Sequence, residues 1–217
     1  MKGLGGLGHT LACPPANKIM QPPIEQQPLP FLFVHIPKTG GMSIRKFLVE
    51  RFGYGVRTYA SDDGPDLHDT LFQLEHLNPT SPDTFVFAVC RNPYRRAYSY
   101  YHYFLKEGMM DPVTFEQYLR DIDNTPLNKL RQDHFMQGRW LITQRAYPKR
   151  YVYRFENLAE FEQQWGCTLP RENSSNFDLE NYRKEYTEGA KKLVEDIYWE
   201  DFVTFEYPVD WEQSLVG

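Results

Sequence analysis

The sequence predicts an α/β fold in which a central parallel sheet lies between two layers of helices, a three-layer sandwich. Three short segments rich in bulky apolar side chains, 31–36, 85–90 and 151–155, have the composition of buried strands. Segments with helical spacing of apolar residues separate them. Strands that alternate with helices in this way pair in parallel through right-handed connections.

The composition is that of a globular protein. Of the 217 residues, 41% are hydrophobic and 24% are charged, and the mass of 25.7 kDa allows one domain with a sizeable core. The net charge is -5 and the pI is about 5.7, so the overall balance gives no indication of nucleic-acid binding. No apolar run approaches the roughly 18–20 residues that a membrane span requires.

The three cysteines, Cys13, Cys90 and Cys167, are widely separated along the chain. Their odd number and their spacing fit neither a disulfide framework nor a zinc site. They favour a reducing compartment, and we therefore expect a cytoplasmic protein.

The N-terminal segment 1–30 is rich in Gly and then in Pro and Gln. Such a composition is typical of mobile chain. We therefore expect a flexible leader over 1–30 and one folded domain over 31–217.

A strand, a Gly-containing turn and the start of a helix follow one another within 31–52. Pro37 ends the strand because it carries no N–H. Gly40 and Gly41 allow backbone angles and close approaches that other residues do not. Ser43 is a candidate helix cap, and the helix after it has an apolar face formed by Ile44, Phe47 and Leu48.

This turn directs backbone N–H groups and the positive end of a helix towards one point, which favours an anion. Lys38 adds a mobile cation, and Thr39 and Ser43 add hydroxyl donors, so we interpret the turn as a phosphate-binding loop. It differs from the G-x-x-x-x-G-K-[ST] loop of nucleoside-triphosphate enzymes, because Lys38 precedes the glycine pair. An ordinary tight turn is the alternative, and six specified positions after an apolar strand disfavour it.

A second basic site follows the strand predicted at 85–90. Arg91 comes directly after this strand, at the edge where open α/β sheets bind ligands, and Ser99 lies about two turns along the following helix. A guanidinium can hold phosphate oxygens through two hydrogen bonds while a hydroxyl fixes the register. Arg95 and Arg96 lie at the helix N-terminus, where the helix dipole disfavours cations, so we expect an anion near them.

The remaining segments complete the predicted topology. Between the first two strands we expect a loop with a short helix over 70–77. Beyond the second basic site come a short helix over 111–120 and an interrupted helix over 125–143. The third strand leads into a helix that ends at Trp165, and a further helix spans 188–202.

Two motifs resemble those of the sulfotransferases that use 3′-phosphoadenosine 5′-phosphosulfate (PAPS). The string HIPKTGGMS at 35–43 resembles their 5′-phosphosulfate loop, in particular in the branch that includes carbohydrate 2-O-sulfotransferases and small bacterial relatives. RNPYRRAYSYY at 91–101, about fifty residues later, resembles their 3′-phosphate signature. The strings RFENL and DFVTFEY are also similar to this family, so the resemblance covers 31–207. It implies the P-loop-like sulfotransferase fold.

The resemblance assigns a role to each residue of the two basic motifs. It implies that the 5′-phosphate is held by the backbone amides of Thr39, Gly40, Gly41, Met42 and Ser43. Lys38 would meet the bridging oxygen of the leaving group. Arg91 and Ser99 would bind the 3′-phosphate, which distinguishes PAPS from ATP or ADP.

His68 lies between the two motifs, in a His-Asp-Thr string that small bacterial relatives also show. The resemblance implies that it is the general base. An imidazole with an unperturbed pKa of about 6.5 can accept a hydroxyl proton near neutral pH. His76, beside an Asn-Pro loop, is expected on the surface.

Two more segments resemble parts of the family that touch ligands. Arg171, Asn173 and Ser174 match a loop that lies over the nucleotide, which implies further PAPS contacts. His134 and Gln137 loosely match positions that contact the acceptor in relatives.

The implied activity is transfer of a sulfuryl group from PAPS to an acceptor hydroxyl, in line and without a covalent enzyme intermediate, leaving 3′-phosphoadenosine 5′-phosphate (PAP). A carbohydrate is the first candidate acceptor, and no metal is required. The partners are therefore a nucleotide and a hydroxyl-bearing acceptor, with no nucleic acid. Acceptor choice depends on variable loops, so the sequence sets neither the acceptor nor the oligomeric state.

Two other classes of function stay open. One is a P-loop-type small-molecule kinase, which the second strand disfavours because it ends in Cys90 and Arg91 rather than in a magnesium-binding Asp. The other is a non-catalytic module that binds PAPS or PAP. The presence of Lys38 and of a candidate base disfavours it.

Overall fold

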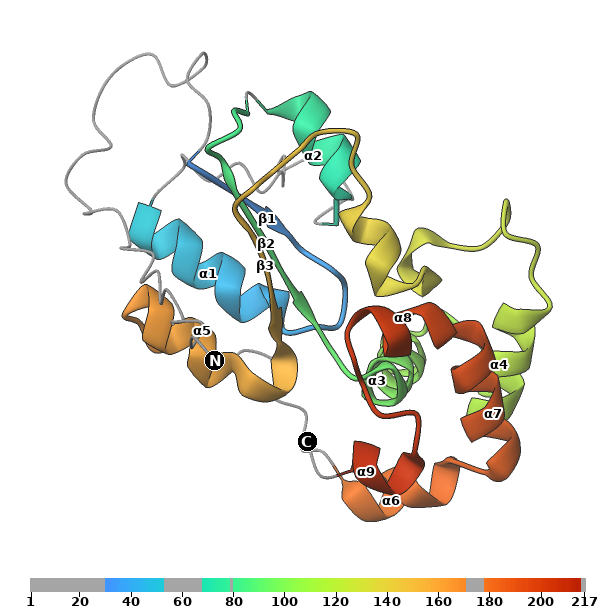
Figure 1. Ribbon diagram of the computed structural model, residues 1–217. Coiled ribbons are helices and arrows are strands. Elements are labelled where there is room, and N and C mark those ends of the chain that lie inside the picture. Colours follow the sequence, from blue (N-terminus) through green and yellow to red (C-terminus); the bar gives the residue numbers. More distant parts are fainter. Residues whose placement is uncertain (1–29, 53–67, 79, 171–177, 216–217) are drawn as a thin grey trace, which may run out of the picture.

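The computed structural model describes residues 30–52, 68–78, 80–170 and 178–215. Within these ranges the sheet has three parallel strands in the order β1-β2-β3 (Figure 1). They are β1 (Phe31–Val34), β2 (Phe85–Cys90) and β3 (Arg150–Arg154). Phe31 pairs with Phe85, and Cys90 pairs with Arg154. Because all strands run the same way, their carboxyl ends lie at one edge of the sheet.

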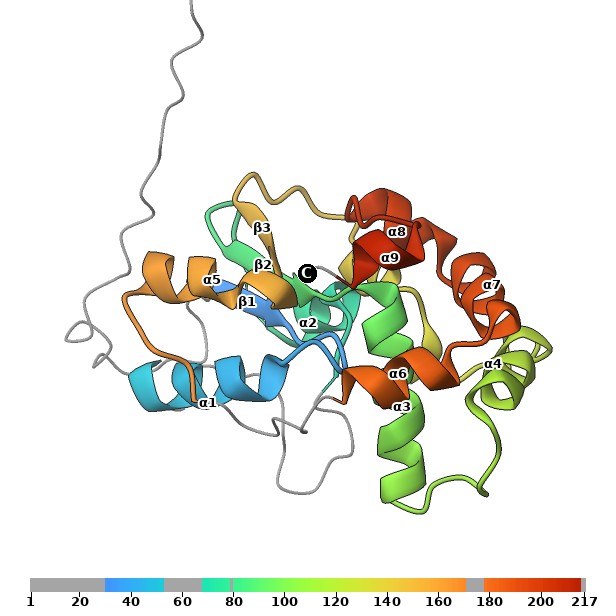
Figure 2. The ribbon, with the colours of Figure 1, turned by 90° about the horizontal axis from the view of Figure 1, so that it is seen from below.

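One face of the sheet packs on α1 (Gly41–Phe52) and α5 (Leu158–Trp165), which lie on the same side of it in Figures 1 and 2. Side chains alternate between the faces of a strand, and Phe33, Phe87 and Tyr153 point to this one. The helices contribute the buried side chains Ile44, Phe47, Leu48, Phe52, Phe161 and Trp165.

The opposite face packs on α2 (Leu71–Leu77) and on the 3₁₀ helix η5 (Gln137–Leu141). Val34 and Ala88 contribute to this core from the strands, and Trp140 contributes from η5. Helices cover both faces, so the predicted three-layer α/β architecture is confirmed. The strand β2 and the helices α2 and α5 have the predicted positions, and Thr70 forms a capping box at the start of α2.

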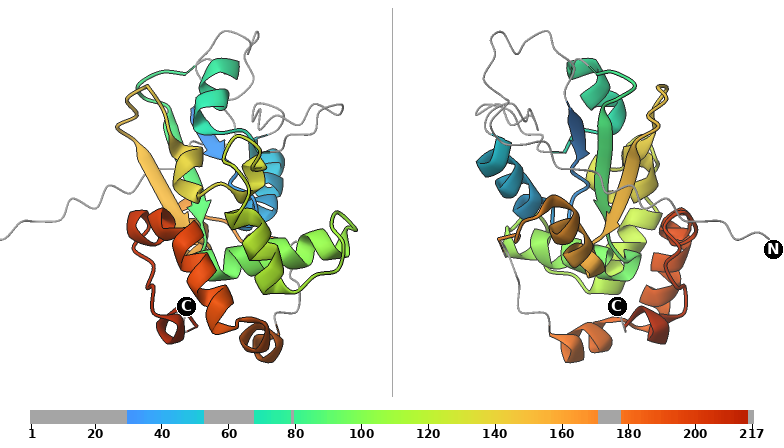
Figure 3. Two further views of the ribbon diagram at one scale, coloured as in Figure 1. Left: turned by 90° about the vertical axis from the view of Figure 1, so that its right-hand side faces the viewer. Right: turned by 60° about the vertical axis from the view of Figure 1, so that its left-hand side comes forward.

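A cluster of helices lies beyond the carboxyl edge of the strands, with its C-terminal members drawn in red in Figure 3. Its core is rich in tyrosine and phenylalanine. The helices are α3 (Pro93–Lys106), α4 (Phe115–Asp123), α6 (Leu179–Glu185), α7 (Glu188–Ile197), α8 (Trp199–Thr204) and α9 (Trp211–Ser214). None of the helices in the described ranges is long and apolar enough to cross a membrane.

The predicted helix over 125–143 is wrong. Turns and two short 3₁₀ helices, η4 (Gln132–His134) and η5, occupy this segment. The backbone N–H groups of Gln137 and Gly138 donate to the carboxylate of Asp201 instead of to a helix carbonyl. This tertiary contact fixes a conformation that local spacing does not reveal.

Other boundaries differ by a few residues. β1 ends at Val34, and α1 begins at Gly41, so Ser43 lies in the first turn of the helix and is not its cap. α4 begins at Phe115 because the hydroxyl of Thr114 accepts the N–H of Gln117. The helix predicted over 188–202 is divided into α7 and α8, and α6 was not predicted. The leader up to residue 29 lies outside the described residues.

Candidate active site

Residues after all three strands meet at the carboxyl edge of the sheet. The turn that follows β1 provides what we call the anion loop, residues 38–43. Arg91 follows β2, and Phe155 and Glu156 follow β3 in the 3₁₀ helix η6 (Phe155–Asn157). Figure 1 shows α1 starting close to this edge.

The anion loop has an unusual backbone. Lys38 has a φ of 64°, in the left-handed region that side chains disfavour, and Gly40 has a φ of 81°. The buried hydroxyl of Thr39 donates to the carbonyl of Ile36 (2.8 Å), so it stabilises the turn. The loop then enters α1, where the N–H of Ser43 donates to the carbonyl of Gly40 (3.2 Å). Other N–H groups of a first helical turn have no carbonyl partner within the helix, and with the positive helix end they are the features that an anion-binding loop requires.

The glycine pair permits two close contacts. A Cβ added at Gly40 would lie 2.7 Å from the ring of Phe155, and one added at Gly41 would lie 1.9 Å from the ring of His35. The anion loop therefore approaches both the end of β1 and the residue after β3 more closely than any other residue type would allow.

The ammonium of Lys38 lies over the ring of Tyr103, 4.2 Å from its centroid. Partial burial, with Arg91 and Lys106 nearby, lowers the pKa of Lys38 to about 8. The group is therefore mostly charged at neutral pH and sits among other cations. Such a local concentration of positive charge in an acidic protein suits an anionic ligand.

Arg91 connects the second strand to the anion loop. Its Nη1 donates to the carbonyl of Lys38 (3.1 Å), and its guanidinium carbon lies 4.3 Å from the ring centroid of Phe155. Burial lowers the pKa of Arg91 to about 10, and Glu156 opposes this effect. The buried Nε has no hydrogen-bond partner among the described residues. A buried donor of this kind is costly unless a ligand or solvent satisfies it.

Gln137 fixes the backbone of Arg91. Its Oε1 accepts the N–H of Arg91 (2.8 Å), and its Nε2 donates to the carbonyl of Arg91 (2.8 Å). Asp201, fully buried on α8, in turn accepts the N–H groups of Gln137 (2.8 Å) and Gly138 (3.0 Å). The side chain of Gln137 is therefore engaged with protein backbone, away from the acceptor role predicted for it. Neither it nor Asp201 was identified from the sequence as a positioning residue.

Replacing Asp201 by alanine is expected to reduce the free energy of unfolding by about 3–5 kcal/mol, because it leaves buried donors and the charge of Arg96 without their carboxylate. Urea unfolding followed by circular dichroism measures the loss. Asp196→Ala is the matched control, since Asp196 forms only an exposed ion pair with Lys192, worth less than about 1 kcal/mol. Equal losses in the two variants would contradict this role of Asp201.

Two arginines of α3, Arg95 and Arg96, donate hydrogen bonds to backbone carbonyls. Arg96 is fully buried and donates to the carbonyls of Pro37 (3.2 Å) and Phe135 (3.1 Å). Arg95 donates to the carbonyl of Leu215 (3.1 Å). Both guanidinium groups therefore donate to backbone carbonyls, and an anion near them stays a prediction. The bond from Arg96 to Pro37 holds the residue before the anion loop.

His68 is partly exposed and lies beside His35, the residue that follows β1. Its Nδ1 is 2.9 Å from the carbonyl of His35, and the two rings are 4.4 Å apart. A carbonyl oxygen only accepts, so Nδ1 carries the hydrogen and Nε2 is the nitrogen that can take up a proton. Because the ring of His35 touches Gly41, His68 is close to the anion loop, as a general base must be.

His134, a predicted acceptor contact, is buried among the rings of Tyr100, Phe104 and Tyr118. Ser99 is partly exposed on α3, one turn before Tyr103.

Met42 and Ser43 complete the anion loop in the first turn of α1. Met42 is 39% exposed and Ser43 is buried. Arg171, Asn173 and Ser174 lie outside the described residues. Within the ranges that the structure describes, no three His, Cys, Asp or Glu side chains are grouped to hold a metal ion.

Phe155 and Tyr103 were not predicted as site residues. We interpreted the string RFENL as architectural, although its position directly after a strand of the sheet could have indicated that Phe155 lies at the site. Tyr103 follows Ser99 by four residues, which places both on one helix face and was a usable signal.

No family model matches the chain, and no curated protein matches it by sequence. Among solved structures, the chain is similar to a sulfotransferase from Alicyclobacillus acidocaldarius. The sequences are 14% identical, the match covers 87% of this chain and 99% of that one, and the TM-score is 0.48.

Proposed function

We propose that the protein is a PAPS-dependent sulfotransferase. The observation that carries the proposal is the hydrogen bond from Arg91 to the carbonyl of Lys38 (3.1 Å), which joins two cationic sites that follow consecutive strands. PAPS has phosphates on the 3′ and 5′ positions of one ribose, so a protein that binds it needs two neighbouring anion sites. An enzyme for ATP needs only the 5′ site.

The donor set fits this nucleotide. The backbone amides of Thr39 to Ser43 would hold the 5′-phosphate at the start of α1, and the N–H of Ser43 would be shared with the carbonyl of Gly40 (3.2 Å). Arg91, with its unpaired buried Nε, and Ser99 would hold the 3′-phosphate. Arg171, Asn173 and Ser174 remain proposed additional contacts.

When bound, PAPS supplies an activated sulfuryl group. The bond between sulfur and the bridging phosphate oxygen breaks as a new bond forms to the acceptor oxygen. Lys38 stabilises the negative charge that develops on the leaving phosphate. His68 accepts the acceptor proton at Nε2, and its Nδ1–H remains bonded to the carbonyl of His35.

We propose a carbohydrate hydroxyl as the acceptor, one catalytic domain over 31–217 and a cytoplasmic location. The buried thiol of Cys90, which forms no disulfide, fits a reducing compartment. His134 and Gln137 are not retained as acceptor contacts, because aromatic rings enclose the first and backbone groups engage the second.

The test is incubation of the full chain with PAPS and a panel of acceptors, followed by mass spectrometry. We expect a gain of one sulfuryl group on at least one carbohydrate and formation of PAP. ATP with magnesium ions in place of PAPS should give no product. Phosphoryl transfer from ATP would instead establish the kinase alternative.

Replacing Arg91 by alanine is expected to weaken PAP binding about 10- to 100-fold, because charge-assisted hydrogen bonds to the 3′-phosphate are lost. Affinity for adenosine 5′-monophosphate, which lacks that phosphate, should change much less. Calorimetric titration measures both. Arg183→Ala, an exposed arginine on α6, is the control and should bind PAP as the wild type does. Equal losses for both nucleotides would contradict the assignment of Arg91 to the 3′-phosphate.

A further inference from the structure

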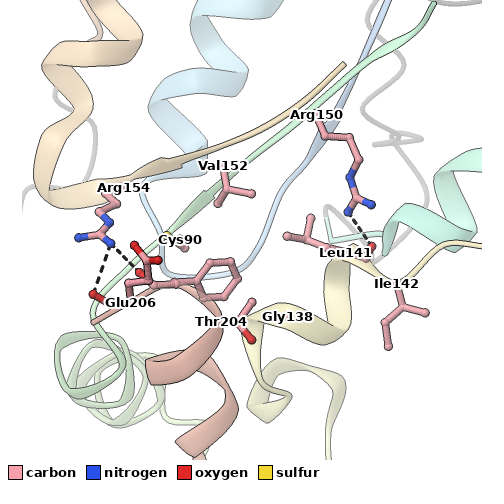
Figure 4. Close-up of a pocket in the computed structure, with 10 residues that line it drawn as sticks. Cys90, Gly138, Leu141, Ile142, Arg150, Val152, Arg154, Thr204 and Glu206 are labelled. Atoms are coloured by element: carbon pink, nitrogen blue, oxygen red, sulfur yellow. Dashed lines mark hydrogen bonds between the residues drawn. The ribbon is translucent and has the colours of Figure 1, made fainter. Parts of the chain in front are cut away.

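A cavity lies beside β3, with a volume of about 490 Å³ (Figure 4). It opens on the sheet face opposite to the one that carries Tyr153 and packs on α1 and α5. Its walls come from β3, from η5 and from the segment that ends α8. None of the residues of the anion loop lines it.

Two arginines from β3 lie on the same face of the strand, on either side of Val152. Figure 4 shows their guanidinium groups turned towards opposite ends of the cavity. Arg150 donates through Nη2 to the carbonyl of Leu141 (3.1 Å), and Arg154 donates through Nη2 to the carbonyl of Phe205 (2.6 Å). Each contact engages one of the guanidinium nitrogens and leaves other N–H groups for a ligand.

These two cations are not neutralised by the protein at close range. No carboxylate among the described residues forms an ion pair with Arg150 or Arg154. Glu206 lines the cavity and offsets part of the charge, so two cations face one anion there. In a protein of net charge -5, a cavity with an excess of positive charge favours an anionic ligand.

The region between the arginines is apolar. Val152, Leu141 and Phe205 form its walls, and Cys90 lies at its base. Burial raises the pKa of the Cys90 thiol to about 11, so this group is neutral at physiological pH. A ligand therefore meets charge at the two ends and hydrocarbon in the middle.

We propose that this cavity binds an elongated organic dianion, with an oxyanion group at each end and an apolar body between them. Four residue-to-residue steps along an extended strand separate the Cα atoms of Arg150 and Arg154 by about 13 Å. This spacing suits two separate oxyanions better than a single one. The proposal is independent of the sulfotransferase activity.

The test compares two probes with the same aromatic body, naphthalene-2,6-dicarboxylate and 2-naphthoate, by calorimetric titration of the full chain. We expect the dicarboxylate to bind about tenfold more tightly, because it engages both guanidinium groups. Arg150→Ala and Arg154→Ala should each remove this preference. Glu206→Gln should tighten binding of the dicarboxylate, because it removes the opposing charge.

Two controls locate the probe. Arg183→Ala removes an exposed arginine outside the cavity and should leave both affinities unchanged. Lys38→Ala should also leave them unchanged, because the anion loop is a separate site. The proposal is overturned if the wild type shows no preference for the dicarboxylate, or if Lys38→Ala loses probe binding while the β3 variants, folded by circular dichroism, retain it.

Discussion

Lys38→Ala is expected to lower kcat for sulfuryl transfer by about 10²–10³-fold, the usual effect of removing one group that stabilises developing charge. Affinity for PAP should fall much less, because the backbone amides of the anion loop and Arg91 remain. Steady-state kinetics and calorimetry on the same preparation measure the two quantities. The structure gives the reason for the size of the effect, since the ammonium is partly buried and the local field is therefore strong.

The pH profile provides a check on Lys38 that does not depend on the alanine variant. The ammonium is needed in its charged form, and its pKa in the ligand-free protein is lowered to about 8. We therefore expect kcat/KM, which reports the free enzyme, to decrease as the pH rises above about 8. Lys38→Arg retains its charge at higher pH, so this decrease should disappear in that variant. A Lys38→Ala enzyme with wild-type kcat would contradict the role.

His68→Ala is expected to keep its affinity for PAP and to lose about 10²–10⁴-fold in rate, as befits a general base. Other residues bind the nucleotide, whereas no base is left to accept the proton of the acceptor hydroxyl. Single-turnover measurements with saturating PAPS isolate the chemical step from product release.

His76 supplies a matched control for His68. Its Nδ1 also lies near a backbone carbonyl, that of Phe72 (2.7 Å), but it is exposed on α2. His76→Ala should therefore turn over like the wild type. If both histidine variants retain full activity, another group accepts the proton and our assignment of His68 is wrong.

The sequence allowed prediction of the parts that depend on neighbouring residues. An apolar run predicted β2, and the sequence indicated a short helix over 70–77, where the structure has α2 with Thr70 as its cap. The glycine pair of the anion loop indicated a close backbone approach, and the structure identifies its neighbours as the rings of His35 and Phe155. Local chemistry was enough to find both sites of positive charge.

The contacts that hold these sites in place could not be predicted from the sequence. Gln137 bonds to the backbone of Arg91 across 46 residues, and Asp201 bonds to Gln137 across 64. No sequence motif marks either pair. A Gln or Asp that will be buried cannot be told from an exposed one in the sequence, because its partner is brought close only by the fold. The same contacts explain why 125–143 does not form the predicted helix.

The most direct test of the account is calorimetric titration of the full chain with PAP and with adenosine 5′-monophosphate. Our central claim is that the anion loop and Arg91 bind the two ends of one nucleotide. We predict one PAP site per chain and an affinity for PAP about tenfold or more above that for adenosine 5′-monophosphate, because Arg91 meets the additional phosphate. No binding of PAP, or equal affinities for the two nucleotides, would contradict the claim.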